Sequence, residues 1–440
     1  MGSGGCCGDP MLMQRNLTGL AGGTRWISSL RVQLLVEILV GVALPLIARF
    51  GIQSNYDHHP SAPASLVLSL CSVMSATLLS RRIGGFPGTR TFIYVLPSFS
   101  MAFGLAMMTA LVLRLDYNRT VLIASFTLSV SAAYALAYLS ARGAMRRFYV
   151  VPGGRTSSLY EVRDAEWFRM EEPIVPGGRN VMIVADLHYD LESAWERMLA
   201  RAAINGVAVY HVKQVRELLT GRVQIEHLSE NSFGSLLPNL AYRKFKRIID
   251  LVGCVVVLPF LAIAMAIIAI VIRFDSPGPV FFRQQRMGYR GRPFTMIKFR
   301  TMKPRPIGVG DGVRRNDAIT QTDDDRITRV GRFLRRTRLD EIPQILNIIV
   351  GQMSWIGPRP EAMDLSVWYE AEIPFYSYRH IVRPGITGWA QVNQGHVADL
   401  AEINMKLQYD FFYVKNFSAW LDVLITMRTV MVMLSGFGSK

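Results

Sequence analysis

Asp340 and Glu341 are adjacent carboxylates in a strongly basic part of the chain. The arginines that could add positive charge around them include Arg332, Arg335, Arg336, Arg338 and Arg359. Behind the pair, "EIPQILNIIVG" repeats apolar residues at helical spacing and ends on Gly351, which predicts a helix with Asp340 as its N-cap. The free N–H groups of a helix start and the nearby arginines would attract a phosphate and keep an acid ionised.

Such a site suits phosphoryl transfer. A carboxylate held among cations beside a phosphoanhydride can attack phosphorus and form an acyl phosphate. A neighbouring carboxylate can bind a divalent ion that neutralises the phosphate oxygens. The alternative is that Asp340 only caps the helix and Glu341 only pairs with an arginine. The residue types by themselves leave both interpretations open.

The composition indicates that part of the chain lies in lipid. The 440 residues are 50% hydrophobic and carry a net charge of +16, with a mean hydropathy of +0.23. Four apolar stretches between residues 29 and 145 each approach the length of a bilayer-spanning helix, which predicts four transmembrane helices. Arginines flank both ends of this region, whereas residues 51–63 contain no Lys or Arg. Both ends should therefore face the cytoplasm. His58 and His59 in that loop lack a third metal ligand.

Two further segments are expected to lie in the cytosol. Residues 1–28, with Cys6 and Cys7, are interpreted as a disordered tail. Residues 146–240 alternate short β-rich runs with a helical stretch, which predicts a small α/β domain. Gly153 and Gly154 follow its first strand, but no G-x-G-x-x-G phosphate loop is present, so a structural or regulatory module is expected. The four cysteines predict neither a zinc site nor a disulfide framework.

The apolar stretch 251–274 is long enough to cross a bilayer but contains Pro259. Basic clusters lie on both of its flanks, and a spanning helix would place one of them outside the cell. We therefore expect a re-entrant helix that breaks near Leu258 and Pro259 and returns to the same side. A kinked fifth transmembrane helix is the alternative. The preceding "YRKFKR" would lie at the anionic inner leaflet.

Five segments in this half of the chain, "KFRTM", "LDEIPQ", "IGPRP", "RPGITGWAQVN" and "YDFFYVKN", resemble motifs of one family. That family is the monotopic phosphoglycosyl transferases. Its members are the polyprenyl-phosphate hexose-1-phosphate transferases that begin the synthesis of bacterial surface polysaccharides. The resemblance runs from residue 242 to the C-terminus, and the preceding helices and α/β domain are similar to the long subgroup of the family. It implies a membrane α+β fold in which residues 241–440 form a mainly helical catalytic domain, anchored by the re-entrant helix around Pro259.

The resemblance also implies roles for individual residues. It makes Asp340 the nucleophile and Glu341 a ligand of Mg²⁺. The substrate-binding residues that it implies are Arg335 and Arg359 on phosphate, Lys298 and Arg300 lining the same pocket, and Arg383 and Asp410 near the nucleotide sugar. Three positions depart from the family pattern: Arg338 stands where a serine or threonine is common, Leu258 replaces a serine before the proline, and "QGH" with His396 replaces a glycine-arginine pair.

The reaction implied is transfer of a hexose 1-phosphate from a UDP-hexose to undecaprenyl phosphate, through an aspartyl-phosphosugar at Asp340, with release of UMP. The expected location is the bacterial cytoplasmic membrane, as a multi-pass protein with its catalytic domain facing the cytoplasm. Family analogy suggests a homodimer, and no nucleic-acid partner is expected. The alternative is a catalytically silent membrane scaffold or lipid-binding protein of a polysaccharide assembly complex. A transporter is disfavoured because Glu37 is a lone acid in the predicted spans. The motifs do not name the hexose.

Overall fold

The computed structural model describes residues 27, 29–51, 60–87, 89, 91–141, 147–162, 165–177, 181–225, 238, 240–303, 326–394 and 400–435. Within these residues the fold is mostly helical, with several long apolar helices and a small parallel sheet. The chain divides into two compact units, residues 1–221 and 222–440. Cys6, Cys7, His58, His59 and His396, which the sequence interpretation singled out, lie outside the described residues.

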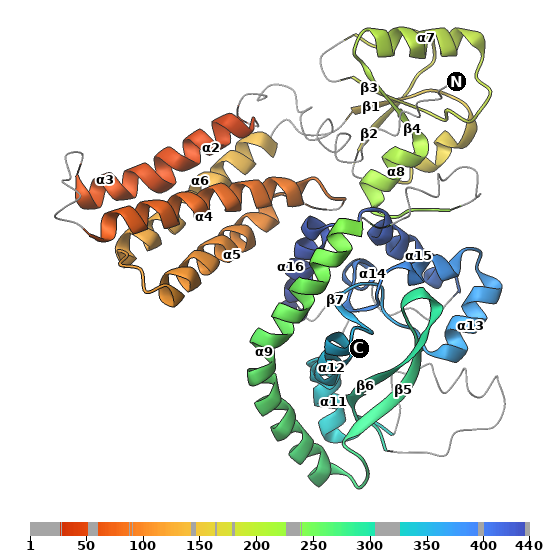
Figure 1. The fold of residues 1–440 in the computed structure, drawn as a ribbon. Coiled ribbons are helices and arrows are strands. Elements are labelled where there is room, and N and C mark those ends of the chain that lie inside the picture. The colour runs from red at the N-terminus through yellow and green to blue at the C-terminus, as the bar shows by residue number, and fades with distance from the viewer. Residues whose placement is uncertain are drawn as a thin grey trace. The chain divides into compact units, whose positions relative to one another are not determined.

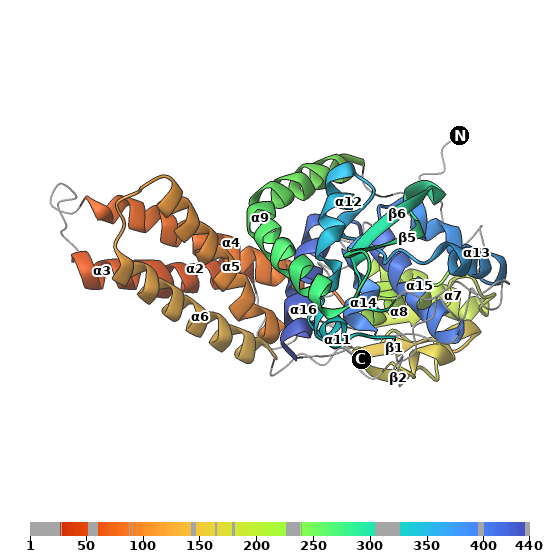
Figure 2. The ribbon, with the colours of Figure 1, turned by 90° about the horizontal axis from the view of Figure 1, so that it is seen from below.

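Four apolar helical segments occupy the first part of unit 1 (Figures 1 and 2). They are α2 (Leu30–Ile38) continued by η1 (Leu39–Ala43) and α3 (Leu44–Phe50), then α4 (Ser61–Gly84), α5 (Thr91–Val112) and α6 (Arg119–Ala141). The segments pack side by side around Val42, Val73 and Phe99. Among the described residues, five helices are long and apolar enough to cross a membrane: these four and a fifth in unit 2.

The rest of unit 1 is a small parallel sheet with helices on both faces, in the part of the chain where the sequence predicted a small α/β domain. Its strands are β1 (Arg147–Val150), β2 (Glu166–Arg169), β3 (Met182–Ala185) and β4 (Ala208–His211), in the order β2-β1-β3-β4, and its helices include α7 (Ser193–Ile204) and α8 (Val212–Thr220). Val184 of β3 packs with Val215 of α8, whereas Ile183 packs with Trp195 of α7. Because neighbouring side chains of a strand point to opposite faces, the sheet is buried on both sides. Because all its strands are parallel, their carboxyl ends meet at one edge of the sheet.

Unit 2 begins with a long helix and a hairpin, followed mainly by short helices (Figure 1). The long helix is α9 (Leu240–Asp275), and the hairpin strands are β5 (Phe281–Met287) and β6 (Pro293–Phe299). The following elements are α11 (Arg329–Arg336), η6 (Leu339–Gln344), α12 (Ile345–Val350), β7 (Ser354–Ile356), α13 (Met363–Glu372), η7 (Tyr376–Ile381), β8 (Gly385–Thr387), α14 (Trp389–Asn393), α15 (Leu400–Lys415) and α16 (Ala419–Ser435). Strands β7 and β8 pair in parallel.

The predicted break in α9 is absent. The helix continues through Pro259 and bends instead (Figures 1 and 2). A proline removes one backbone hydrogen bond and crowds the preceding turn, which bends a helix without necessarily ending it. Packing supports the helix on both sides of the bend: Cys254 and Leu261 contact the cluster around Ile345, and Ile272 contacts Phe299. The whole length of α9 therefore lies against the rest of unit 2.

The other face of α9 is apolar and exposed. The side chains on it include Val252, Val255, Phe260, Ile263, Ile267 and Ile270, each more than half exposed. An exposed apolar face of this length, on a helix whose opposite face is packed, is typical of a surface that lies in lipid.

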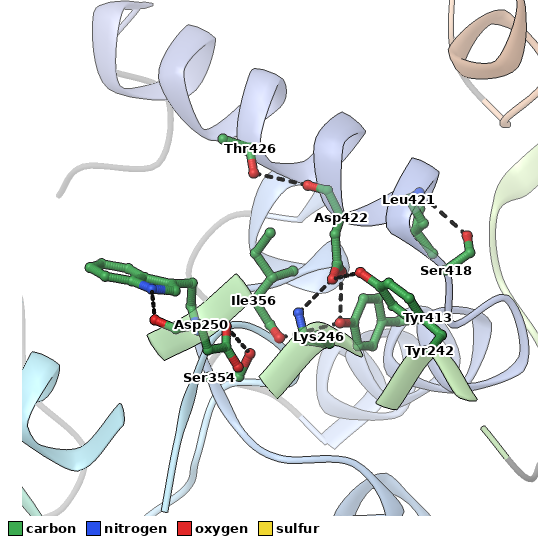
Figure 3. A network of polar contacts seen from close by, with 11 residues as sticks. Tyr242, Lys246, Asp250, Ser354, Ile356, Tyr413, Ser418, Leu421, Asp422 and Thr426 are labelled. Carbon is green, nitrogen blue, oxygen red and sulfur yellow. Dashed lines mark hydrogen bonds and ion pairs between the residues drawn. The ribbon is translucent and has the colours of Figure 1, made fainter. Parts of the chain in front are cut away.

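A buried polar network holds the start of α9 to the rest of the unit (Figure 3). The Lys246 ammonium lies 2.5 Å from a carboxylate oxygen of Asp422 on α16. The hydroxyl of Tyr242 donates to the same oxygen of Asp422 at 2.5 Å, and the hydroxyl of Tyr413 donates to the other oxygen at 2.8 Å. One turn further along α9, Asp250 accepts from the Ser354 hydroxyl at 3.0 Å. These contacts fix the first turns of the helix to β7 and α16.

Candidate active site

Asp340 and Glu341 lie in η6, a short 3₁₀ turn between α11 and α12 that packs against β6. Arg338, directly before this turn, adopts a left-handed backbone with φ of 59°. The prediction that Asp340 is the N-cap of the following helix is therefore wrong, because the chain turns at Arg338 and both acids lie inside the turn. The predicted helix end is confirmed: Gly351 ends α12 with φ of 92°.

Glu341 is buried and paired with arginines. Its Oε1 accepts a hydrogen bond from Arg359 at 2.7 Å and lies 3.5 Å from the Arg338 guanidinium. Burial by itself would raise the pKa of Glu341, but the charge and hydrogen bond of Arg359 outweigh it, and the pKa lies below its usual value. Glu341 is therefore ionised at neutral pH.

The pKa of Asp340 is shifted in the opposite direction from that of Glu341. It is buried, and none of the described residues donates a hydrogen bond to its carboxylate. Burial and the negative charge of Glu341 raise the pKa of Asp340 to about 6, although Lys298, Arg359 and Arg335 oppose the shift. The expectation that the basic surroundings would simply keep this acid ionised underestimated burial and its charged neighbour. At neutral pH most of the carboxylate is still deprotonated.

Cations from three segments frame the pair. Lys298, on β6, has its ammonium 5.1 Å from the centre of the Phe282 ring, and burial followed by the charge of Arg286 lowers the pKa of Lys298 to about 8. Arg335, on α11, is close enough for its charge to lower the pKa values of Lys298 and Asp340. The structure thus brings Lys298, Arg335 and Arg359 to the carboxylate pair, as the resemblance implied.

Two parallel strands position Arg359. Gly357, after β7, donates its N–H to the carbonyl of Thr387 at 2.8 Å, and Gly385 donates to the carbonyl of Pro358 at 3.0 Å. A Cβ atom at Gly385 would lie 2.1 Å from the Gly357 nitrogen, so the two backbones can approach this closely only at a glycine. The "IGPRP" and "RPG" motifs therefore act together to fix the loop that carries Arg359.

Arg300 lies in a different environment from the pair. Its guanidinium donates to the carbonyl oxygens of Ser276 at 2.6 Å and Pro277 at 2.9 Å, in the turn that follows α9. Gly278, in the same turn, has φ of 122°, and a Cβ there would lie 2.1 Å from a guanidinium nitrogen of Arg300. In this structure Arg300 therefore holds the end of α9 rather than a carboxylate of the pair.

Arg383 and Asp410 also make their contacts elsewhere. The Nε of Arg383 donates to the carbonyl of Gly351 at 2.9 Å, and its guanidinium lies 5.3 Å from the centre of the Tyr289 ring. Tyr289 and His380 help to line a hollow of about 530 Å³ that the carboxylate pair does not line. Asp410 is buried in an ion pair with Arg379 at 2.8 Å.

Three residues behind the site were missed by the sequence interpretation. Arg379 donates to the backbone carbonyl of Arg359 at 2.8 Å, and Arg286 donates to the carbonyl of Pro360 at 2.8 Å. Glu361 lies between the cations Lys406 and Arg379; burial would raise its pKa, but these charges lower it to about 2. These residues support the Arg359 loop. Glu361 directly follows "GPRP", which is the only sequence signal that could have suggested it.

The donors at the pair fit a magnesium ion. Both arginines that contact Glu341 lie on its Oε1, and Asp340 accepts no hydrogen bond from a described residue. Mg²⁺ binds one or two protein carboxylates and completes its coordination with water and substrate phosphates. A divalent cation here would also relieve the repulsion between two adjacent buried carboxylates.

Comparisons with known proteins give a consistent result. The family described as bacterial sugar transferase matches residues 241–436. The chain is 38% identical over 407 residues to a UDP-N-acetylgalactosamine-undecaprenyl-phosphate N-acetylgalactosaminephosphotransferase of Aeromonas hydrophila, covering 91% of this chain and 94% of that relative.

Two UDP-glucose:undecaprenyl-phosphate glucose-1-phosphate transferases match over less than half of this chain. The one from Xanthomonas campestris pv. campestris is 44% identical over 191 residues, which is 43% of this chain and 38% of the relative. The one from Escherichia coli (strain K12) is 40% identical over 203 residues, which is 45% of this chain and 41% of the relative. The family match lies within the unit that carries the carboxylate pair.

Proposed function

Because this chain belongs to the bacterial sugar transferase family, we propose that it transfers a hexose 1-phosphate from a UDP-sugar to undecaprenyl phosphate and so begins the repeat unit of a surface polysaccharide. The names of the relatives give UDP-sugars as donors and undecaprenyl phosphate as the acceptor. The observation that carries the proposal is the buried pair Asp340–Glu341, framed by Lys298, Arg335 and Arg359.

The reaction proceeds in two displacements at one phosphorus. An oxygen of the Asp340 carboxylate attacks the β-phosphorus of the UDP-sugar, and the bond from that phosphorus to the bridging oxygen breaks, so that UMP leaves with the electron pair. A phosphate oxygen of undecaprenyl phosphate then attacks the same phosphorus and releases Asp340. Asp340 is suited to this role because it is deprotonated at neutral pH yet accepts no hydrogen bond from a described residue.

The cations around the pair stabilise the charge that moves onto the phosphate oxygens. Arg359 approaches from the loop after β7 and Lys298 from strand β6, so they can contact different oxygens of one diphosphate. Mg²⁺ would be held by Glu341, with Asp340 beside it, and would supply further positive charge to the diphosphate. Glu361 and Arg379 keep the Arg359 loop in place throughout.

Release of UMP tests the proposal. Purified protein in nanodiscs, with Mg²⁺ and undecaprenyl phosphate, should release UMP from one or two members of a UDP-sugar panel. UDP-N-acetylgalactosamine is the first sugar to test, because the relative that matches nearly end to end is named for it. Replacing Mg²⁺ with EDTA should stop the release. If well-folded protein released no UMP from any sugar, the scaffold alternative would replace this proposal.

The rate of UMP release should depend on pH with two limbs. Asp340 must be deprotonated to attack, and its pKa is raised to about 6, so kcat/KM should fall about tenfold per pH unit below pH 6. Lys298 must be protonated, and its pKa is lowered to about 8, so the rate should fall again above pH 8. Initial rates at low UDP-sugar between pH 5 and 9 measure both limbs.

Lys298→Arg provides the control for this profile, because arginine stays protonated throughout the range. This variant should lose the alkaline limb and keep the acid limb. A rate that did not change between pH 5 and 7 would contradict the assignment of Asp340 as a nucleophile with a raised pKa.

We also propose that α9 is re-entrant and that the catalytic unit lies at the cytoplasmic face of the inner membrane. Both ends of α9 contact the same unit: Lys246 and Asp250 near the start, Ile272 near the end. A helix that crossed the bilayer would have to separate one of these ends from the unit on which it packs. The exposed apolar side chains between them supply the surface that enters the lipid.

A further inference from the structure

Three side chains with metal-binding atoms meet in the small α/β domain, away from the carboxylate pair in sequence and in a different unit. Asp186 directly follows β3, His188 is two residues further along, and His211 ends β4. One ligand atom from each lies within 4.8 Å of the others. The Nδ1 atom of His188 is 2.7 Å from Nε2 of His211, and Nδ1 of His211 is 4.0 Å from Oδ1 of Asp186.

Backbone groups fix the carboxylate of this cluster. Oδ2 of Asp186 accepts from the N–H of Arg155 at 3.0 Å, and Oδ1 accepts from the N–H of His188 at 3.2 Å. Gly154 has φ of +61°, and a Cβ there would lie 2.4 Å from Oδ2 of Asp186. Gly154, the second of the two glycines after β1, therefore lets the β1 loop approach the Asp186 carboxylate.

One ring nitrogen in the cluster lacks a partner. The Nδ1 atom of His211 is buried and has no hydrogen-bond partner in the described part of the chain. Buried polar atoms in proteins are normally satisfied, so an unpaired one needs an explanation such as an ion or a water molecule.

We propose that Asp186, His188 and His211 bind a divalent transition-metal ion of the Zn²⁺ type at the carboxyl edge of the small sheet. Two imidazoles and one carboxylate suit Zn²⁺ and its first-row neighbours, whereas Mg²⁺ prefers oxygen ligands alone. Three protein ligands leave a coordination position for water or another small ligand. His188 is exposed, so this position can be reached from solvent. The cysteine-based expectation of no zinc did not consider these residues.

The site does not depend on the proposed transferase reaction, so its test measures metal binding directly. The full chain, purified in nanodiscs with a tag that contains no histidine, is dialysed against micromolar Zn²⁺ in the presence of Mg²⁺, and bound zinc is measured by mass spectrometry. We expect one Zn²⁺ per wild-type chain. His188→Ala should weaken Zn²⁺ binding by about 100-fold or more, because even loss of a residue that only supports a ligand typically costs 10- to 100-fold.

Asp190→Asn is the matched control, because it removes an exposed acid near the cluster that is not part of it, and it should leave Zn²⁺ binding unchanged. Asp186→Asn keeps the shape of the side chain and should weaken binding as His188→Ala does. Co²⁺ added in place of Zn²⁺ should give visible absorption bands in the wild type and lose them in both variants. Wild-type protein that bound no Zn²⁺, or His188→Ala that bound it as tightly as wild type, would overturn the proposal.

Discussion

Asp340→Asn should abolish UMP release while making the folded protein more stable. Asparagine has the same shape as aspartate but cannot attack phosphorus, so we expect kcat to fall by about 10⁴-fold or more, as when a catalytic nucleophile is removed. The folded-state pKa of Asp340 is raised from 3.8 to about 6, which means that folding disfavours its ionised form. The free energy of unfolding therefore falls as pH rises from 3.8 to 6. The neutral asparagine should raise the free energy of unfolding by about 2 to 3 kcal/mol at pH 7.

Thermal unfolding and UMP release on the same preparation measure both effects. Asp364→Asn is the matched control: it removes an exposed acid in the first turn of α13 and should change neither. An Asp340→Asn variant that was inactive and also less stable would support the alternative in which this acid only holds the turn. A variant that still released UMP would remove Asp340 as the nucleophile.

Cysteines at the two ends of α9 should react with an impermeant maleimide only from the cytoplasmic side. In a chain whose native cysteines are replaced by alanine, Lys244→Cys precedes the apolar part of the helix and Arg283→Cys follows it, both at exposed positions. Neither should be labelled in intact cells, and both should be labelled after the membrane is opened. The physical reason is that both ends of α9 pack on the same unit.

Two further positions make this labelling interpretable. Ser54→Cys, in the loop that the charge pattern places outside, should be labelled in intact cells. Phe260→Cys, at the bend on the exposed apolar face, should resist labelling in both preparations because lipid covers it. If only one end of α9 were labelled in intact cells, the helix would span the membrane and the re-entrant proposal would fail.

The elements of this fold follow mostly from patterns within short windows of sequence. Hydrophobic length predicted the apolar helices, and alternation of strand and helix predicted a small α/β domain where the structure has the parallel sheet. The local rule for proline predicted a break at Pro259, and it was wrong because the rule ignores what packs on the helix. Cys254, Leu261 and Ile272 pack on the rest of unit 2 before and after the bend, and these contacts stabilise one continuous helix.

The sequence predicted which residues form the site more completely than it predicted how they are arranged. Motifs implied Asp340, Glu341, Lys298 and Arg359, and the structure brings these together. The left-handed backbone of Arg338, which moved Asp340 out of the N-cap position, has no sequence signal because arginine rarely adopts it. Arg286 and Arg379 support the Arg359 loop by hydrogen bonds to backbone carbonyls that lie 74 and 20 residues away from them in the sequence. Local spacing cannot reveal pairs so far apart.

The arrangement of Glu341 and Arg359 means that the site is preorganised. Arg359 is already held by Glu341 at one of its own nitrogens and by Arg379 at its carbonyl. Because Arg338 and Arg359 both lie on Oε1 of Glu341, the carboxylate can act as a ligand through its other oxygen while keeping these partners. Little dipole or side-chain reorientation is then required when a diphosphate arrives. In an environment of low dielectric constant, avoiding that reorganisation contributes much of the catalytic effect of fixed charges.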